Sequence, residues 1–414
     1  MTSIGGAEMV DWNLAVATAI RLVRPGPEVS RDEARAVVAE LRRHAKTSER
    51  HVREYTRMIP EGAAASDTPV LVVDRAGWVK ANVAGFRELL GPLLAKMQDR
   101  RGNAPGGAVL GAVGGKVTGV ELGMLLSFLA SRVLGQYETF APAALDLPSS
   151  ATGGRLLLVA PNIVHVEREL AVNPHDFRLW VCLHEETHRT QFTAVPWLRD
   201  HLEGEIQTFL EATEMDPMNV LERLREAAQS FAGARPADER GDEGHSLVEI
   251  VQTPEQREVL ARLTAVMSLL EGHADFVMDG VGPDVVPSVA EIREKFQQRR
   301  ASGAGRLDAA LRKLLGLDAK LRQYRDGERF VRAVVDQVGM DGFNRVWTSP
   351  NTLPTKAEIA SPAEWVTRVH GKGGERGGQG GLGGESGGEG GQGGEAGQGG
   401  VEGGDAGQGG HDTL

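Results

Sequence analysis

The sequence predicts an α+β fold that is mainly α-helical and contains a small β-sheet. Apolar residues recur at helical spacing through much of the first 370 residues, and residues 8–60 are the first such region. The short segment from Arg155 to Ala160, which is apolar after its first residue and is followed by Pro161, instead predicts a strand. Beyond about residue 370 the chain has almost nothing to bury, because 23 of its last 44 residues are glycine. We therefore expect the fold to end near residue 370.

Three regions follow from these patterns. Residues 1–150 form a helical N-terminal region, and residues 151–370 carry the candidate chemistry and continue the same compact unit. Residues 371–414 form a disordered tail rich in glycine and glutamate. This tail is either a flexible tether or a tolerated low-complexity extension.

Two segments of the N-terminal region have unusual composition. The glycine-rich stretch from Gly102 to Gly115 is expected to be a loop, and it lacks the spacing of a phosphate-binding loop. The apolar stretch from Val117 to Tyr137 is expected to be a buried helix rather than a membrane span, because glycines and charged residues interrupt it. Its Gly119 and Gly123 suit close helix packing.

The clearest chemical pattern is a HExxH motif: His184, Glu185, Glu186, Thr187 and His188. At ~100° per residue, histidines four positions apart return to nearly the same side of a helix, so both rings can bind one metal ion. Glu185 is offset toward that side and can hold a proton for a metal-bound water, whereas Glu186 points away. Asn173 and Pro174 predict the start of the helix that carries the motif.

A hydrolytic zinc site needs a third protein ligand, and the best candidate lies in the segment from Leu269 to Asp275, which holds Glu271, His273 and Asp275. A capping box from Thr253 to Gln256 predicts the start of a second helix, which continues to about residue 278. On that helix Glu271 and Asp275 share one face, and His273 falls on the opposite side.

This two-part pattern resembles the gluzincin peptidases, in which HExxH is followed on a later helix by ExxxD. The resemblance implies a zincin-like fold, with the small sheet next to the HExxH helix. It also implies one Zn²⁺ per chain, held by His184, His188 and Glu271, with Asp275 accepting a hydrogen bond from the far ring nitrogen of His184. His273 is a secondary candidate for metal binding or acid–base chemistry.

The chain is also similar, over most of residues 8 to 370, to an actinobacterial family of zincin-like (type 2) metallopeptidases. Some members of that family are labelled as associated with biosynthesis of a deazaflavin coenzyme. The metal motifs are the only part of the likeness that carries chemistry.

The resemblance implies a zinc-dependent hydrolase, and more specifically a metallopeptidase acting on a peptide or protein substrate. The ion would polarise the scissile carbonyl and lower the pKa of its water, and Glu185 would pass the water's proton to the leaving amine. Gluzincins often stabilise the oxyanion with a tyrosine or histidine from outside the two motifs. The candidates, among which we assign none, are Tyr55, Tyr137, Tyr324, His245 and His273.

The strand at Arg155 to Ala160 lies just before the HExxH helix, as in zincins. By resemblance, the sheet edge there would bind an extended peptide by strand addition. The alternative is a strand that belongs only to the core.

Other interpretations of the motif remain open. The motif residues could form a charged helix face without metal, or the chain could be a zincin-scaffold metal-binding or interaction protein without turnover. Retention of Glu185 disfavours the latter, because a structural site needs no base, and such sites often use several cysteines whereas this chain has only Cys182. Cys182 is expected in the core. An accessory role in deazaflavin biosynthesis rests on the family label alone.

Composition excludes several classes of protein. The net charge of −11 disfavours a general nucleic-acid binder, and the acidic residues Glu8 and Asp11 precede the first apolar stretch, which is the wrong charge order for a secretory signal. We therefore expect a cytoplasmic protein that binds neither nucleic acid nor membrane. The oligomeric state is not predicted.

Overall fold

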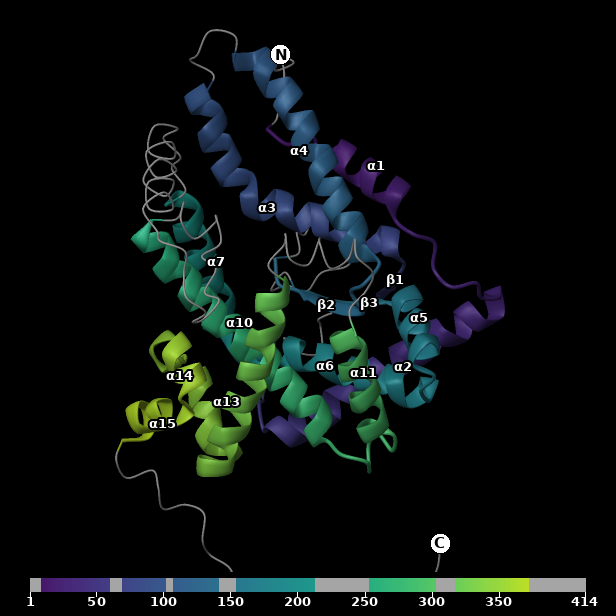
Figure 1. Cartoon of the computed structure of the whole chain (residues 1–414), viewed down its shortest axis with the longest axis vertical. Helices are drawn as coiled ribbons and strands as arrows, with labels where there is room; N and C mark the ends of the chain where they lie inside the picture. The colour runs from purple at the N-terminus through teal and green to yellow at the C-terminus, as the bar shows by residue number, and fades with distance from the viewer. Residues whose placement is uncertain are drawn as a thin grey trace, which may run out of the picture. The chain divides into compact units, whose positions relative to one another are not determined.

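The computed structural model is mainly helical and contains a three-stranded sheet, which confirms the α+β class (Figure 1). It describes residues 9–59, 69–101, 107–140, 154–212, 253–302 and 317–371. The described residues belong to one compact unit, Met1–Gly377. Residues 372–414, where we expect the tail, lie outside the described residues. His245 lies outside them too, and the proposed region boundaries stay predictions.

The elements follow one another in an order that places the sheet early in the chain. The first part comprises α1 (Trp12–Leu22), α2 (Arg31–Thr56), β1 (Val70–Val73), α3 (Arg75–Arg101), α4 (Gly107–Ala130), β2 (Gly135–Glu138) and β3 (Arg155–Val159). The second part begins with α5 (Ala160–Leu170), α6 (Pro174–Ala194), α7 (Pro196–Glu211), α10 (Pro254–Gly280), α11 (Val289–Ser302) and α13 (Leu317–Phe343). It ends with the short helices η2 (Asn344–Trp347), η3 (Pro350–Thr352), α14 (Lys356–Ala360) and α15 (Pro362–His370).

The sheet has the order β1-β3-β2, with β1 parallel and β2 antiparallel to the central strand β3. All five residues of β3 are buried. The interpretation of this segment as a core strand is therefore confirmed, and within the described residues the edge next to the HExxH helix belongs to β2. The strand is one residue shorter than expected, since Ala160 already begins α5.

Side chains of β3 alternate between two apolar clusters, as the pleat of a strand requires. Leu158 packs into the larger cluster with residues of α2, α6, α10 and α13. Leu157 and Val159 pack into a smaller cluster with residues of α1, α3 and α4. The sheet thus forms a layer between two groups of helices, which explains why β3 has no polar face.

Both predicted helix starts are confirmed. Asn173 accepts a hydrogen bond from the backbone N–H of Asp176, with Pro174 as the first residue of α6. Thr253 and Gln256 exchange the two hydrogen bonds of a capping box at the start of α10. The two helices expected to carry metal ligands therefore begin where local hydrogen-bonding chemistry fixes them.

Two expectations for the N-terminal region are wrong in part. Residues 107–115 belong to α4 rather than to a loop, because extending an established helix by one residue adds a hydrogen bond without a new nucleation step. The apolar run predicted as one helix to Tyr137 divides: α4 ends at Ala130, and β2 then pairs with β3. Ladder hydrogen bonds to a buried strand outweigh the helical pattern there.

The expectation that Gly119 and Gly123 permit close packing is confirmed. A Cβ atom at Gly119 would lie 2.6 Å from the carbonyl oxygen of Asp11, and one at Gly123 would lie 2.7 Å from that of Ala15. Helices α1 and α4 therefore touch through their backbones. Among the described residues, no helix combines the length and apolar character that crossing a membrane requires.

Helix α13 packs directly on α10 at another pair of glycines. A Cβ atom at Gly327 would lie 1.9 Å from the carbonyl oxygen of Ser268, and one at Gly272 would lie 2.1 Å from the carbonyl carbon of Gly327. Backbone lies against backbone on both sides, so no flexible side chain can move to make room. This contact fixes α10 next to Glu271.

We expect Gly327→Ala to lower the free energy of unfolding by about 1–3 kcal/mol or more, because the added methyl group would force the helices apart. Chemical denaturation measures the effect. Gly204→Ala is the matched control: Gly204 is exposed within α7 with nothing within 4 Å of its added Cβ, and alanine there should stabilise the chain by up to about 1 kcal/mol. Equal effects of the two substitutions would contradict the close-packing explanation.

Candidate metal centre

The structure brings His184, His188 and Glu271 together where α6 packs against α10. One ligand atom from each of the three lies within 4.8 Å of the others. The two histidines come from successive turns of α6, and Glu271 projects from α10, 83 residues later in the chain than His188 (271 − 188). The HExxH motif and the later glutamate therefore meet in one volume.

The spacing of the donor atoms suits a tetrahedral ion. The Nε2 atoms of His184 and His188 lie 3.3 Å apart, and the carboxylate oxygens of Glu271 lie 3.7 Å and 3.8 Å from them. Zinc bonds of about 2.0–2.1 Å at tetrahedral angles separate ligand atoms by about 3.3 Å. Two neutral imidazoles and one carboxylate, with a fourth position left for water, form a donor set typical of hydrolytic zinc.

Asp275 lies behind His184, as the ExxxD pattern implies. Its Oδ1 is 3.5 Å from Nδ1 of His184, the ring nitrogen remote from the donor group. A carboxylate in this place holds the proton on Nδ1 and leaves Nε2 free to bind a metal.

Gln191 orients His188 as Asp275 orients His184, and no motif in the sequence pointed to it. Its Oε1 lies 3.0 Å from Nδ1 of His188, and its Nε2 donates a 2.9 Å hydrogen bond to the carbonyl oxygen of Leu270. A backbone carbonyl can only accept, so this bond fixes which way the amide points and presents Oε1 to His188. The ring of His188 is thereby held with Nε2 toward the donor group.

His273 does not belong to the donor group. It is fully buried against Phe343 and Trp347, and its Nδ1 accepts a hydrogen bond from Nε2 of Gln191. Burial lowers the pKa of His273 to about 3, so the ring is neutral and can accept this bond. Its place is behind Gln191, on the side of α10 that faces the core.

Glu185 lies beside the donor group and under strand β2. A Cβ atom on Gly135 would lie 2.5 Å from Cγ and 2.7 Å from Oε1 of Glu185, so the carboxylate occupies space that only glycine leaves open. Burial raises the pKa of Glu185 well above its usual range, and the charge of Glu271 raises it further. A carboxylate so placed has a raised proton affinity, as a general base requires.

Two other side chains of this part of α6 face the protein core: Glu186 within the motif and Cys182 just before it. Glu186 accepts hydrogen bonds from Arg189, which also pairs with Glu49 of α2, and burial raises the pKa of Glu186 to about 7. Cys182 is buried with its Sγ 3.9 Å from the carbonyl oxygen of Leu41, which confirms it as a core residue. Both side chains are turned toward α2.

The tyrosines do not supply an obvious oxyanion donor. The Tyr55 hydroxyl lies against Gly280, and the Tyr137 ring stacks on Phe192. Burial raises the pKa of Tyr137 to about 12, so its hydroxyl stays protonated. The side chain of Tyr324 lies outside the described residues, and the role stays unassigned.

We expect Gln191→Leu to weaken zinc binding by about 10- to 100-fold, because His188 would lose the partner that orients its ring. Competition with a chromogenic chelator measures the affinity. Thr193→Val is the matched control, since it also removes a hydrogen bond from α6, to the carbonyl of Arg189, but touches no metal candidate. Unchanged zinc affinity in Gln191→Leu would contradict an orienting role.

Comparison with known proteins identifies the family to which the chain belongs. A solved structure, "Crystal structure of a putative hydrolase with a novel fold from Chloroflexus aurantiacus", matches with 31% sequence identity and a TM-score of 0.61, covering 88% of this chain and 100% of the other. No curated protein sequence matches significantly. A family model described as zincin-like metallopeptidase matches residues 10–366, which include both helices of the donor group. The chain therefore belongs to the zincin-like metallopeptidase family.

Proposed function

We propose that the chain is a zinc-dependent peptidase, in which His184, His188 and Glu271 hold one zinc ion and Glu185 is the catalytic base. Family membership indicates a zinc-dependent hydrolase, and peptide cleavage is the more specific step that we infer. The observation that carries the proposal is the convergence of three donor atoms within 4.8 Å beside the buried carboxylate of Glu185.

A zinc ion held by these residues would supply a Lewis acid and a water of lowered pKa. The chain's own contribution is to hold and move the proton. Glu185 accepts the proton of the attacking water and delivers it to the leaving nitrogen, and its burial keeps competing bulk water away from the carboxylate. Asp275 and Gln191 keep the two imidazoles in the tautomer that binds metal.

The edge strand β2 favours an extended peptide as substrate. It passes over α6 with Gly135 against Glu185, and within the described part of the sheet it has a neighbour, β3, on one side only. A peptide added to the other side would form main-chain hydrogen bonds and lie along the strand that covers the base. Recognition of this kind depends little on side-chain identity, so we expect broad specificity.

We expect Glu185→Gln to retain zinc and to lower the rate of peptide cleavage by about 10²- to 10⁴-fold, because the amide cannot accept the water's proton. Digestion of a proteome-derived peptide library, followed by mass spectrometry, measures both activity and specificity. Glu271→Ala should lose zinc and activity together.

The controls distinguish the proposal from its alternatives. Cleavage that persists in Glu185→Gln at the wild-type rate would overturn the role of Glu185. A wild-type protein that binds one zinc ion at the motif and cleaves no peptide in the library would favour the metal-binding protein without turnover. An accessory role in deazaflavin biosynthesis has no separate support in the site geometry.

We expect Gly135→Ala to abolish most hydrolytic activity while zinc stays bound, because the three atoms nearest the new methyl group all belong to Glu185, whose carboxylate it would displace. Zinc content, thermal unfolding and library cleavage are measured on the same preparation. Wild-type activity in this variant would show that the close contact between Gly135 and Glu185 does not position the base.

A further inference from the structure

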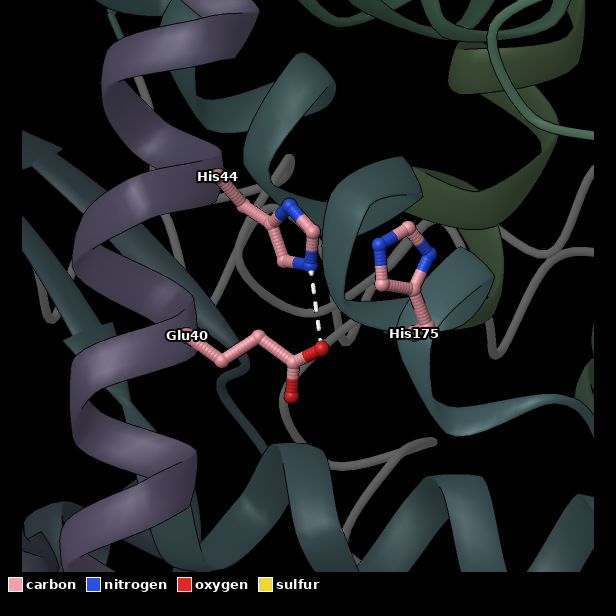
Figure 2. A group of neighbouring side chains, drawn as sticks. All are labelled: Glu40, His44 and His175. Carbon is pink, nitrogen blue, oxygen red and sulfur yellow. Dashed lines mark ion pairs between the residues drawn. The ribbon is translucent and has the colours of Figure 1, made fainter.

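A second group of three potential metal ligands lies apart from the HExxH site: Glu40, His44 and His175 (Figure 2). One donor atom from each lies within 4.8 Å of the others. Glu40 and His44 come from α2, and His175 is the second residue of α6. Among the described residues, this group and the HExxH group are the two with such an arrangement.

Local structure explains why the three side chains meet. Residues four apart share one face of a helix, so Glu40 and His44 project from α2 in the same direction. The cap at Asn173 starts α6 so that its first turn packs on that face. Figure 2 shows the carboxylate of Glu40 and one ring nitrogen of each histidine turned toward a common space.

The contact with Asp176 favours the tautomer of His175 that a metal needs. Its Nδ1 lies 3.3 Å from Oδ1 of Asp176, and the other oxygen of Asp176 accepts hydrogen bonds of 2.9 Å and 2.7 Å from the backbone N–H and hydroxyl of Ser288. Asp176 is therefore a fixed acceptor. A carboxylate at Nδ1 keeps the proton there and leaves the Nε2 lone pair for an ion, as in many metal-binding histidines.

His44 is the buried member of the group and is poorly satisfied by protein alone. Its side chain is 9% exposed, and its buried Nε2 makes no hydrogen bond in the described structure, although Oε1 of Glu40 lies 3.4 Å away. Burial lowers the pKa of His44, and the neighbouring His175 lowers it further, which favours the neutral ring. A neutral, buried imidazole with an unused nitrogen is a suitable ligand.

The charge of Glu40 is also set before any ion binds. Burial favours the protonated carboxyl, but Arg178 binds Oε2 of Glu40 and lowers its pKa overall. Oε1 remains directed toward His44. Because Arg178 also pairs with Glu167, its charge is shared between two carboxylates. The guanidinium still opposes a second cation nearby, so binding here should be weaker than at the HExxH site.

We propose that Glu40, His44 and His175 form a second metal site that binds a divalent transition-metal ion and ties α2 to the start of α6. Two imidazoles and one carboxylate favour Zn²⁺, Co²⁺, Ni²⁺ or Cu²⁺ over Mg²⁺ and Ca²⁺. His175 is exposed, so the ion can enter from solvent and keep water in its remaining positions. The ion would stabilise the folded chain because it binds only when both helices are in place.

The two sites are separate. His175 and His184 are nine residues apart on α6 (184 − 175), which corresponds to about 14 Å along the helix axis. Ions of a two-metal catalytic site lie about 3.5–4 Å apart. The second ion therefore acts on the structure of α6 and not on the substrate.

The test counts cobalt(II) ions bound per chain by equilibrium dialysis and elemental analysis. We expect the wild-type chain to bind two ions, the second more weakly, and His175→Gln to bind one. His175 is exposed, so this substitution should leave the fold intact, which circular dichroism checks. His165→Gln is the matched control, because His165 and Glu169 form an exposed i,i+4 pair on α5 outside both three-residue groups, and it should still bind two ions.

A second variant separates this proposal from the HExxH site. His184→Ala with His188→Ala should retain only the weaker ion, and cobalt should still raise its melting temperature. Adding His175→Gln to that variant should weaken the remaining binding by more than about tenfold and remove the shift. Saturation of the wild-type chain at one ion, or unchanged cobalt binding after His175→Gln, would overturn the second site.

Discussion

Gln191 ties α6 to α10 through its hydrogen bond to the carbonyl oxygen of Leu270, and the candidate site depends on this contact. Neither helix holds a complete donor set: α6 supplies two imidazoles, and α10 supplies Glu271. The same amide orients His188 and is itself held by His273. A buried polar group of this kind is costly when any partner is missing, so the register between the two helices is fixed by the same bonds that orient the ligand.

The sheet also serves both the fold and the site, because it separates two groups of helices and places β2 over the HExxH helix. Its central strand separates two apolar clusters, and this position leaves β2 at an edge of the described sheet, directly over the HExxH helix. Asn162 stabilises the approach to β2, since it donates hydrogen bonds to the carbonyl oxygens of Ala130 and Val133 and accepts one from Arg75. The position of Gly135 over Glu185 thus follows from contacts with α3, α4 and α5.

Local chemistry made part of this architecture predictable from the sequence. The caps at Asn173 and Thr253 act within three residues, and the spacing of His184 and His188 is a property of one helix. Their convergence with Glu271 could be expected only through a family resemblance, because the two helices are far apart in the chain. The roles of the individual site residues remain predictions that the proposed substitutions test.

Other features of the site could not be predicted from the local sequence. Gln191 is three residues after His188, where a glutamine could equally face solvent, and Gly135 matters through the side chain that it lacks. The apolar pattern from Val117 to Tyr137 gave no sign of the change from helix to strand, because strand pairing with β3 is a long-range interaction. The meeting of His175 with α2 likewise depends on helix packing and not on spacing along the chain.

The two metal groups differ in how their negative charge is balanced. Around the HExxH motif, burial raises the pKa of Glu185 and the charge of Glu271 raises it further, so a cation bound there would favour the ionised carboxylate. In the second group, Arg178 already neutralises much of the charge on Glu40. Because the guanidinium of Arg178 repels a dication at the second group, the first group should fill first. The arginine makes the second site weaker, but it also lets α2 and α6 pack before any ion is bound.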